Sequence, residues 1–237
     1  MLITGDGSRT LTSDRYGESY RSRLGALSEA RHLFLEASGV GDRLRRLEPT
    51  SVLEVGFGTG LNFLVTATAA SASGAVLDYL ALERELPPAA AVATLDYPSL
   101  LSPSPLPEQL QAWTSAAPFD LPGEFLFVPP RGGPNGQGAV RLRLLIGDAL
   151  DYAPPVGSFH AIYLDPFSPR ANPEPWSAAY LRRLADALAP GGRLVTFSVS
   201  GAVRRALGAA GLAVNKVPGP PSGKREVLVA RQRAPAP

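Results

Sequence analysis

A turn of alternating glycines and three acidic residues are the parts of this 237-residue chain best suited to chemistry. Residues 56–60 read Gly-Phe-Gly-Thr-Gly directly after the apolar run 51–55, and Glu83, Asp148 and Asp165 each stand at or just after the end of a later apolar run. Glycine permits a positive φ and lets a ligand approach the amide groups at a helix start. A carboxylate at a strand end can accept hydrogen bonds from a ribose or take a proton from a reacting group.

An alternation of apolar runs and helical spacings surrounds these residues and predicts an α/β fold. The expected strands cover residues 51–55, 76–82, 140–146, 159–164, 193–198, 212–217 and 226–230. The expected helices between them cover residues 61–70, 176–188 and 201–210. Such a chain forms a three-layer structure around a mostly parallel sheet, which binds ligands at the carboxyl ends of its strands. The glycine turn and all three acidic residues are expected at that edge.

Two further regions flank or interrupt this pattern. Residues 1–48 are expected to form an extension that covers the site, with a strand or loop followed by a helix over 24–37. The main domain is expected over residues 49–233, with a Pro/Gly-rich insertion at about 98–138 that contains a helix near 108–114 and a strand near 125–128. The glycine-rich residues 131–136 suggest a mobile loop, and residues 234–237 a disordered tail.

Composition excludes several classes of site. The chain has no cysteine, which rules out disulfides, thiolate zinc sites and a cysteine nucleophile, and its two histidines argue against a histidine-rich metal site. We therefore expect no metal. No apolar run reaches the ~18 residues of a membrane span, and the N-terminus lacks a signal-peptide core, so we expect a cytoplasmic protein that does not bind membranes.

Charge is distributed unevenly along the chain. The formal net charge is +2, yet residues 182–237 hold ten Lys or Arg against two Asp or Glu. A basic C-terminal part suits a polyanionic partner, although a solvated arginine-rich surface explains the same composition. The arginines that would suit such a partner are Arg182, Arg183, Arg204 and Arg205.

The glycine turn discriminates between nucleotide-like ligands. The dinucleotide fingerprint needs a further glycine where this chain has Leu61, and no Gly-Lys-Ser/Thr follows as in a phosphate loop. Alternate glycines after an apolar strand that contains an acid, Glu54, are instead typical of methyltransferases that use S-adenosylmethionine. In that interpretation the turn binds the amino-acid end of the ligand, Glu83 the ribose and Asp148 the adenine. Glu83 as a solvated strand-end charge and Asp148 as a helix cap remain alternatives.

Four motifs resemble the methyltransferase part of the MnmC family, also described as MnmD-like, and the resemblance covers residues 4–230. In chain order the motifs are residues 25–32, residues 56–63 (Gly-Phe-Gly-Thr-Gly-Leu-Asn-Phe), Asp165-x-Phe167-x-Pro169 with Asn172, Pro173 and Trp176, and residues 223–226 (Gly-Lys-Arg-Glu). The resemblance implies a Rossmann-like class I fold and methylation of the primary amine of 5-aminomethyl-(2-thio)uridine at the tRNA wobble position. It also implies a stand-alone form without the FAD oxidoreductase domain, whose substrate comes from another enzyme. The chain departs from the family at Pro166, where glycine is usual, and in the length of its insertion.

The resemblance also implies roles for individual residues. Asp165 would be the catalytic carboxylate that accepts a proton from the amine or orients it, because an alkylamine has a pKa near ~10 and is mostly protonated at neutral pH. A turn aspartate that caps its own loop is the alternative. The expected cofactor-binding residues are Glu54, Gly56, Phe57, Gly58, Thr59, Gly60, Asn62, Glu83, Asp148 and Ala149.

Substrate contacts are expected from both ends of the chain. Phe167 would stack on a flipped uracil. Ser198, Lys224 and Arg225 would meet the substrate or its phosphates, with simple solvation as the alternative. Tyr20, Glu29 and His32 match family positions in the N-terminal part, and of these we expect Tyr20 and His32 to bind substrate. The expected partner is the anticodon stem-loop of tRNA.

Two other functions fit the same residues. The first is a small-molecule amine methyltransferase or an aminopropyltransferase of the spermidine synthase type, which would share both the sheet and the amine chemistry. The second is a nucleotide-binding oxidoreductase or a non-catalytic nucleotide-binding module. Stabilisation by S-adenosylhomocysteine but not by NAD would separate this second class from a methyltransferase.

Overall fold

The fold is described by a computed structural model of the chain. It describes residues 1–116, 119, 121–131, 136, 138–221 and 223–232. Most of the glycine-rich stretch 131–136 and the whole C-terminal tail from residue 233 lie outside these ranges, so the expectations of a mobile loop and a disordered tail are not addressed. Within the described ranges, no helix combines the length and the apolar character needed to cross a bilayer.

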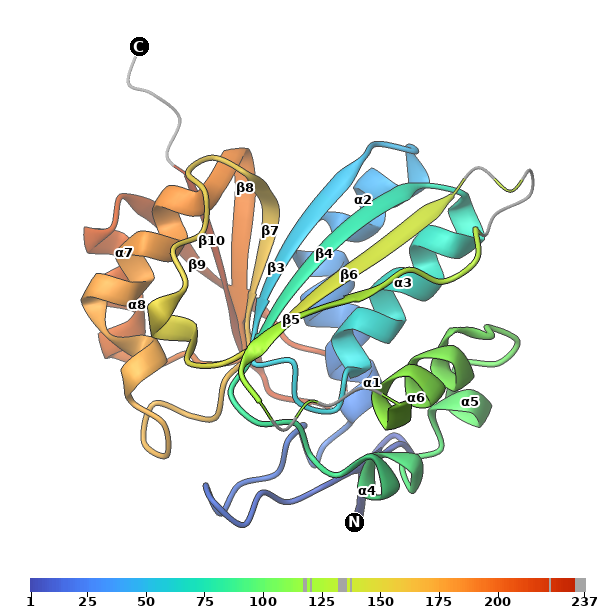
Figure 1. The fold of residues 1–237 in the computed structure, drawn as a ribbon. Coiled ribbons are helices and arrows are strands. Elements are labelled where there is room, and N and C mark those ends of the chain that lie inside the picture. The colour runs from blue at the N-terminus through green and yellow to red at the C-terminus, as the bar shows by residue number, and fades with distance from the viewer. Residues whose placement is uncertain (117–118, 120, 132–135, 137, 222, 233–237) are drawn as a thin grey trace.

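A central mixed sheet organises the molecule (Figure 1). Among the described residues it has eight strands in the order β5-β6-β4-β3-β7-β8-β10-β9. Its parallel strands are β3 (Thr50–Val55), β4 (Val76–Glu83), β6 (Ala139–Ile146), β7 (Phe159–Leu164) and β8 (Leu188–Thr196). The antiparallel additions are β5 (Gly123–Phe127), β9 (Leu212–Pro218) and β10 (Glu226–Gln232). The predicted α/β, Rossmann-like fold is confirmed.

Helices cover both faces of the sheet, as Figure 1 shows. One side carries α1 (Ala26–Glu29), its π-helical continuation η1 (Ala30–Ala37), α2 (Val40–Arg45) and α3 (Leu61–Ser73), and the other side carries α7 (Ala178–Ala187) and α8 (Gly201–Ala209). Because strand side chains alternate, Val52 packs into the core of the first side and Leu53 into the core of the second. Both are fully buried, which explains why β3 is largely apolar on both faces, with Glu54 as its buried charged residue.

The segment boundaries near β8 differ from the sequence-based expectation. The helix expected at residue 176 begins at Ala178, because the Ser177 hydroxyl accepts a hydrogen bond from the Tyr180 amide at 3.4 Å and caps the helix. Trp176 instead ends a short 3₁₀ turn, η3 (Glu174–Trp176). Strand β8 starts at Leu188, directly after α7, and continues through Pro190, whereas the strand was expected to begin only at residue 193.

The N-terminal segment and the insertion gather at the end of the sheet where the parallel strands finish (Figure 1). The N-terminal segment starts with the small antiparallel pair β1 (Leu2–Ile3) and β2 (Arg9–Thr10). The chain between β4 and β5 forms α4 (Ala89–Ala93), α5 (Tyr97–Leu100) and α6 (Leu106–Ala116), so the inserted helices begin before residue 98, where the insertion was expected to start. It is more than a surface loop, because β5 pairs with β6 and extends the sheet by one strand.

Candidate active site

A cavity of about 500 Å³ lies at the carboxyl ends of the parallel strands. Two sets of residues line it. We call the first the sheet wall, formed by Gly56, Gly58, Glu83, Asp148 and Asp165 with their neighbours, and the second the N-terminal wall, which is formed by Tyr16, Glu18, Tyr20, Arg21 and Glu29. The expected gathering of the glycine turn with the three acidic residues is confirmed. The roles assigned to these residues stay predictions.

The glycine turn fits its position because neighbouring backbone and side chains leave no room for a Cβ atom. Gly56 has φ of 91°, and a Cβ there would lie 2.7 Å from the carbonyl oxygen of Asp165. A Cβ on Gly58 would lie 3.1 Å from the Tyr20 ring. Gly60, with φ of 80°, begins α3. Glycine is therefore required both for the backbone conformation and for the close approach of the two walls.

Glu83 is held by backbone amides at the end of β4. Its Oε2 accepts a hydrogen bond from the Gly58 amide at 2.7 Å, and its Oε1 accepts from the Arg84 and Glu85 amides at 2.8 and 3.1 Å. Burial raises the pKa of Glu83, whereas these amides lower it. The carboxylate is thus fixed in orientation while it faces the cavity, an arrangement that suits acceptance of ribose hydroxyl hydrogen bonds.

Asp148 was expected either to bind adenine or to cap a helix. Its Oδ1 accepts a hydrogen bond from the Leu150 amide at 3.0 Å, which caps the 3₁₀ turn η2 (Ala149–Asp151). The capping interpretation is confirmed, and both Asp148 and Ala149 also line the cavity. Nη2 of Arg84 lies 3.6 Å from Oδ2 of Asp148, as an ion pair.

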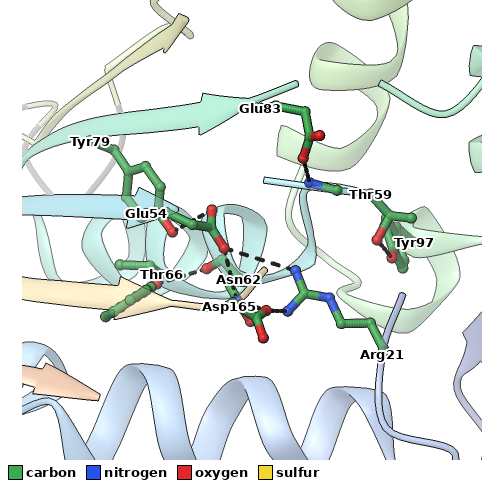
Figure 2. Close-up of polar contacts among 11 residues, drawn as sticks. Arg21, Glu54, Thr59, Asn62, Thr66, Tyr79, Glu83, Tyr97 and Asp165 are labelled. Carbon is green, nitrogen blue, oxygen red and sulfur yellow. Dashed lines mark hydrogen bonds and ion pairs between the residues drawn. The ribbon is translucent and has the colours of Figure 1, made fainter. Parts of the chain in front are cut away.

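Asp165 ends β7 at the centre of a buried polar network (Figure 2). Its Oδ2 accepts hydrogen bonds from Nη1 of Arg21, in a direct ion pair, and from Nδ2 of Asn62 at 2.9 Å. The same Asn62 nitrogen donates to Glu54 at 2.8 Å, and Tyr79 donates to the other Glu54 oxygen at 2.9 Å. Arg21 Nη2 lies 3.9 Å from Glu54. The side chains of Arg21, Glu54 and Asp165 are 3%, 0% and 5% exposed, so the network is desolvated.

Desolvation controls the protonation of this network. Burial raises the pKa of Asp165 to about 6, against the opposing effects of Arg21 and Asn62. Burial raises the pKa of Glu54 further, to about 8, although Arg21 opposes it. Arg21 opposes the effect of burial at both carboxyl groups, so its guanidinium is the cation that compensates the buried acids of this network.

Aromatic side chains form the part of the cavity next to Asp165. The Phe167 ring is stacked on Tyr16 with centroids 4.4 Å apart and meets Tyr20 edge-on at 5.1 Å. Glu18 fixes this contact between the walls, because it accepts hydrogen bonds from the Ser168 hydroxyl at 2.6 Å and the Ser168 amide at 3.0 Å. One face of Phe167 is thus already covered, so a uracil that stacks on that face has to displace Tyr16.

Glu29 and Lys224 complete the lining on the side of α1. Glu29 is 5% exposed, and Lys224 lies over the Phe197 ring with its Nζ 4.2 Å from the centroid. Burial, together with the nearby Asp165, raises the pKa of Glu29 to about 7, against the opposing effects of Lys224 and Arg21. Two carboxylates with different surroundings therefore face one cavity.

Several residues expected at the site do not line this cavity. Glu54 and Asn62 lie behind Asp165 in the network, so they contact a ligand only through it. Thr59 turns toward the insertion, where its hydroxyl is 2.7 Å from the Tyr97 hydroxyl. His32 is tied to the Pro218 carbonyl by a 2.9 Å hydrogen bond of its Nε2. Others also outside the lining are Phe57, Gly60, Ser198 and Arg225.

Arg21 and Tyr16 were not predicted at the site, and Glu29 had no predicted role. Residues 16–23 have neither a strand period nor a helical one, and a charged residue in such a segment normally indicates solvent exposure. The ion pair between Arg21 and Asp165 spans 144 positions of the chain. No local pattern could have indicated it.

The cavity has groups that fit S-adenosylmethionine. Arg21 Nε is buried and has no hydrogen-bond partner among the described residues, and Arg21 lines the cavity. A carboxylate such as that of the amino-acid end of this ligand would satisfy the unpaired N–H group. Glu83 and Asp148 offer acceptors at the ends of the next two strands. Among the described residues, no group of three or more His, Asp or Glu side chains is arranged to hold a metal ion.

Comparisons with known proteins agree with this arrangement. Residues 134–233 match the model of a family of S-adenosyl-L-methionine-dependent methyltransferases. The chain is 36% identical over 239 residues to the tRNA 5-methylaminomethyl-2-thiouridine biosynthesis bifunctional protein MnmC of Burkholderia mallei, which covers 97% of this chain. The chain contains an MnmC methyltransferase-like domain. It spans 34% of the length of that relative.

Two solved structures resemble this chain. The crystal structure of MnmC2 from Aquifex aeolicus superposes with a TM-score of 0.75 at 26% identity, and the match covers 100% of this chain and 71% of that chain. Spermidine synthase from Thermotoga maritima superposes with a TM-score of 0.52 at 13% identity, covering 95% and 72% of the two chains. The second likeness concerns the fold alone. The family resemblance inferred from the four sequence motifs is confirmed.

Proposed function

We propose that this protein transfers a methyl group from S-adenosylmethionine to the primary amine of 5-aminomethyl-(2-thio)uridine at the wobble position of tRNA. The observation that carries the proposal is the buried, oriented Asp165 carboxylate. It lies in the same cavity as Glu83 and Asp148, which suit the nucleoside part of the methyl donor. The MnmC relative is named for 5-methylaminomethyl-2-thiouridine biosynthesis in tRNA. The methylamino group in that name corresponds to a primary amine before methylation, and this amine is the group that we place next to Asp165.

The sheet wall suits the methyl donor. S-adenosylmethionine, when bound, supplies a methyl group on a sulfonium that an amine can attack. Arg21 Nε would hold the carboxylate of its amino-acid end next to Gly56 and Gly58, which permit a close approach to the turn. Glu83 would hold its ribose, and Asp148 with Ala149 its adenine edge. Because methyl transfer requires in-line alignment of nitrogen, carbon and sulfur, fixed positions of these groups contribute much of the rate enhancement.

Asp165 would contact the substrate amine beside this donor site. Arg21 and Asn62 both bind its Oδ2, which holds the carboxylate in one orientation and leaves Oδ1 for the amine. The extruded base would stack on the face of Phe167 that Tyr16 covers, once Tyr16 moves away, with Tyr20 at the edge of the same ring. His32, Ser198 and Arg225 stay proposals with weaker support, since they lie outside the cavity lining.

The anticodon stem-loop would approach over the exposed basic residues near the cavity. Arg23 and Lys224 line the cavity and are exposed. Of the arginines expected to contact tRNA, Arg204 and Arg205 are exposed on α8. Arg182 pairs with Asp186 and Arg183 donates to the carbonyls of 150 and 152, which makes these two less available to phosphates. A tRNA substrate implies action in the cytoplasm after another enzyme has produced the aminomethyl group.

The proposal is tested by incubating the protein and S-adenosylmethionine with tRNA that carries aminomethyluridine, followed by mass spectrometry of the nucleosides. We expect the wobble nucleoside to gain one methyl group, and Asp165→Asn to slow the reaction by at least about 100-fold. The control Asp151→Asn changes an exposed aspartate near the same edge and should leave the rate unchanged.

Two results would contradict the proposal. Methyl or aminopropyl transfer to free polyamines but not to tRNA would support the small-molecule alternative. Stabilisation by NAD in place of S-adenosylhomocysteine would support the nucleotide-binding alternative.

A further inference from the structure

Glu29 is a second carboxylate in the cavity, and the proposed function gives it no role. It ends α1, is 5% exposed and lines the cavity together with Asp165 and Lys224. A nearly buried carboxylate costs free energy unless a partner or a function compensates. Its position therefore needs an explanation.

The two carboxylates differ in how they are bound. Asp165 Oδ2 is in contact with the guanidinium of Arg21 and with the amide of Asn62, so a guanidinium already compensates its negative charge. A carboxylate bound in this way is held in one orientation, and the same Arg21 and Asn62 contacts favour its ionised form. Asp165 is accordingly better suited to hold the amine than to remove its proton.

Glu29 lacks such direct compensation. Its carboxyl group has a backbone hydrogen bond at Ser22, which lowers its pKa, but no side-chain hydrogen bond that affects the pKa. The charged groups that face it are Asp165 at the end of β7, Arg21 in the N-terminal segment and Lys224 before β10. Burial raises the pKa of Glu29 to about 7, and Asp165 adds to this effect. An ordinary glutamate has a pKa of about 4.3 and an alkylamine of about 10. The raised pKa of Glu29 therefore halves the pKa difference between the ammonium that gives the proton and the carboxylate that takes it.

We propose that Glu29 accepts the proton that the substrate ammonium must lose, while Asp165 holds the amine for attack. The proposal rests on the proposed function. The ammonium N–H bond breaks and its proton moves to the Glu29 carboxylate, which leaves the electron pair on nitrogen. That pair forms the new N–C bond to the methyl group, and the electrons of the broken C–S bond stay on sulfur. The product is a secondary ammonium, and Glu29 later releases its proton to solvent.

The dependence of the rate on pH tests this assignment. In the wild-type protein, methylation should rise with pH as Glu29 ionises and then level off above about pH 7. In Glu29→Gln no acceptor is present, so the rate should follow the small fraction of free amine, lie about 100-fold below wild type at pH 7, and rise tenfold per pH unit from about 6 to 9.

Three controls separate this role from a structural one. Thermal stabilisation by S-adenosylhomocysteine should be unchanged in Glu29→Gln, because the donor groups belong to the sheet wall and Arg21. Glu36→Gln alters an exposed glutamate on η1 and should keep the wild-type profile. Glu29→Asp keeps a carboxylate and should regain the levelling-off near neutral pH at a lower rate; it replaces the glutamine variant if that variant does not fold.

The outcomes distinguish this inference from the proposed function. A Glu29→Gln profile that levels off as in the wild type would overturn the assignment of Glu29 while leaving the tRNA methyltransferase proposal intact. A Glu29→Asp profile without levelling-off would also overturn it. Failure of the wild-type protein to methylate the aminomethyl-tRNA at every pH would overturn the proposed function, and the assignment of Glu29 with it.

Discussion

The sheet wall and the N-terminal wall line one cavity but are held in place differently. In the sheet wall, Glu83 binds amides that follow it directly and the amide of Gly58 on the adjacent strand end. In the N-terminal wall, Arg21 and Glu18 reach residues 144 and 150 positions away. The sheet wall thus forms as soon as the sheet does, whereas the N-terminal wall exists only when the segment packs across the finished sheet.

This difference separates two functions within the cavity. The sheet wall consists mainly of glycines and strand-end carboxylates, which suit the nucleoside and amino-acid parts of a methyl donor. The N-terminal wall contributes rings and a second carboxylate, which suit a base and an amine, whereas its Arg21 guanidinium pairs with Asp165 of the sheet wall. Apart from this pair, which belongs to both functions, we expect changes in the first wall to act on donor binding, and changes in the second to act on stability and on tRNA. Three substitutions test that division.

The largest effect is expected at Arg21, which joins the two walls. Arg21→Met leaves the Asp165 carboxylate buried without its cation, and removal of one partner of a buried pair costs about 3–5 kcal/mol. Urea unfolding followed by tryptophan fluorescence measures the loss. Arg15→Met, in the same segment but 53% exposed, should cost less than about 0.5 kcal/mol. Equal stability of the two variants would show that Arg21 does not join the walls.

A smaller effect is expected at Glu83 in the sheet wall. Glu83→Gln weakens the charge-assisted hydrogen bonds to the turn and to the donor ribose, at a cost of about 1.5–3 kcal/mol, so S-adenosylhomocysteine should bind about 10- to 100-fold more weakly in calorimetry. Affinity for tRNA should stay the same. The neighbouring Glu85→Gln, whose side chain is 74% exposed, is the matched control. If Glu83→Gln changed only the affinity for tRNA, the sheet wall would not be the part of the cavity that binds the methyl donor.

The smallest effect is expected at Tyr16 in the N-terminal wall. Tyr16→Ala removes a ring stacked on Phe167, and an aromatic pair contributes about 0.5–1.5 kcal/mol. We expect KM for tRNA to change by about 2- to 10-fold without a change in affinity for S-adenosylhomocysteine, whereas Tyr16→Phe should behave as the wild type. A loss of S-adenosylhomocysteine affinity would show that Tyr16 serves the donor instead.

Much of the fold and half of the site followed from local patterns. Apolar runs predicted the parallel strands because the central ones, β3, β4 and β7, are largely buried on both faces. The carboxyl ends of parallel strands meet at one edge, which brought Gly56, Glu83 and Asp165 together. Patterns failed where tertiary contacts override them. The short helices α4 and α5 lie in a proline-rich stretch, and β8 runs through a Pro-Gly-Gly sequence that local preference assigns to a turn.

The sequence by itself determined the type of sheet, the glycine turn and the strand-end carboxylates, because these depend on periodicity and on conformational limits that each residue carries with it. Only the tertiary structure decided that Arg21 pairs with Asp165, that Tyr16 covers Phe167 and that Glu29 faces the cavity. These contacts join distant parts of the chain, and their energies arise from burial, which exists only once the chain has folded.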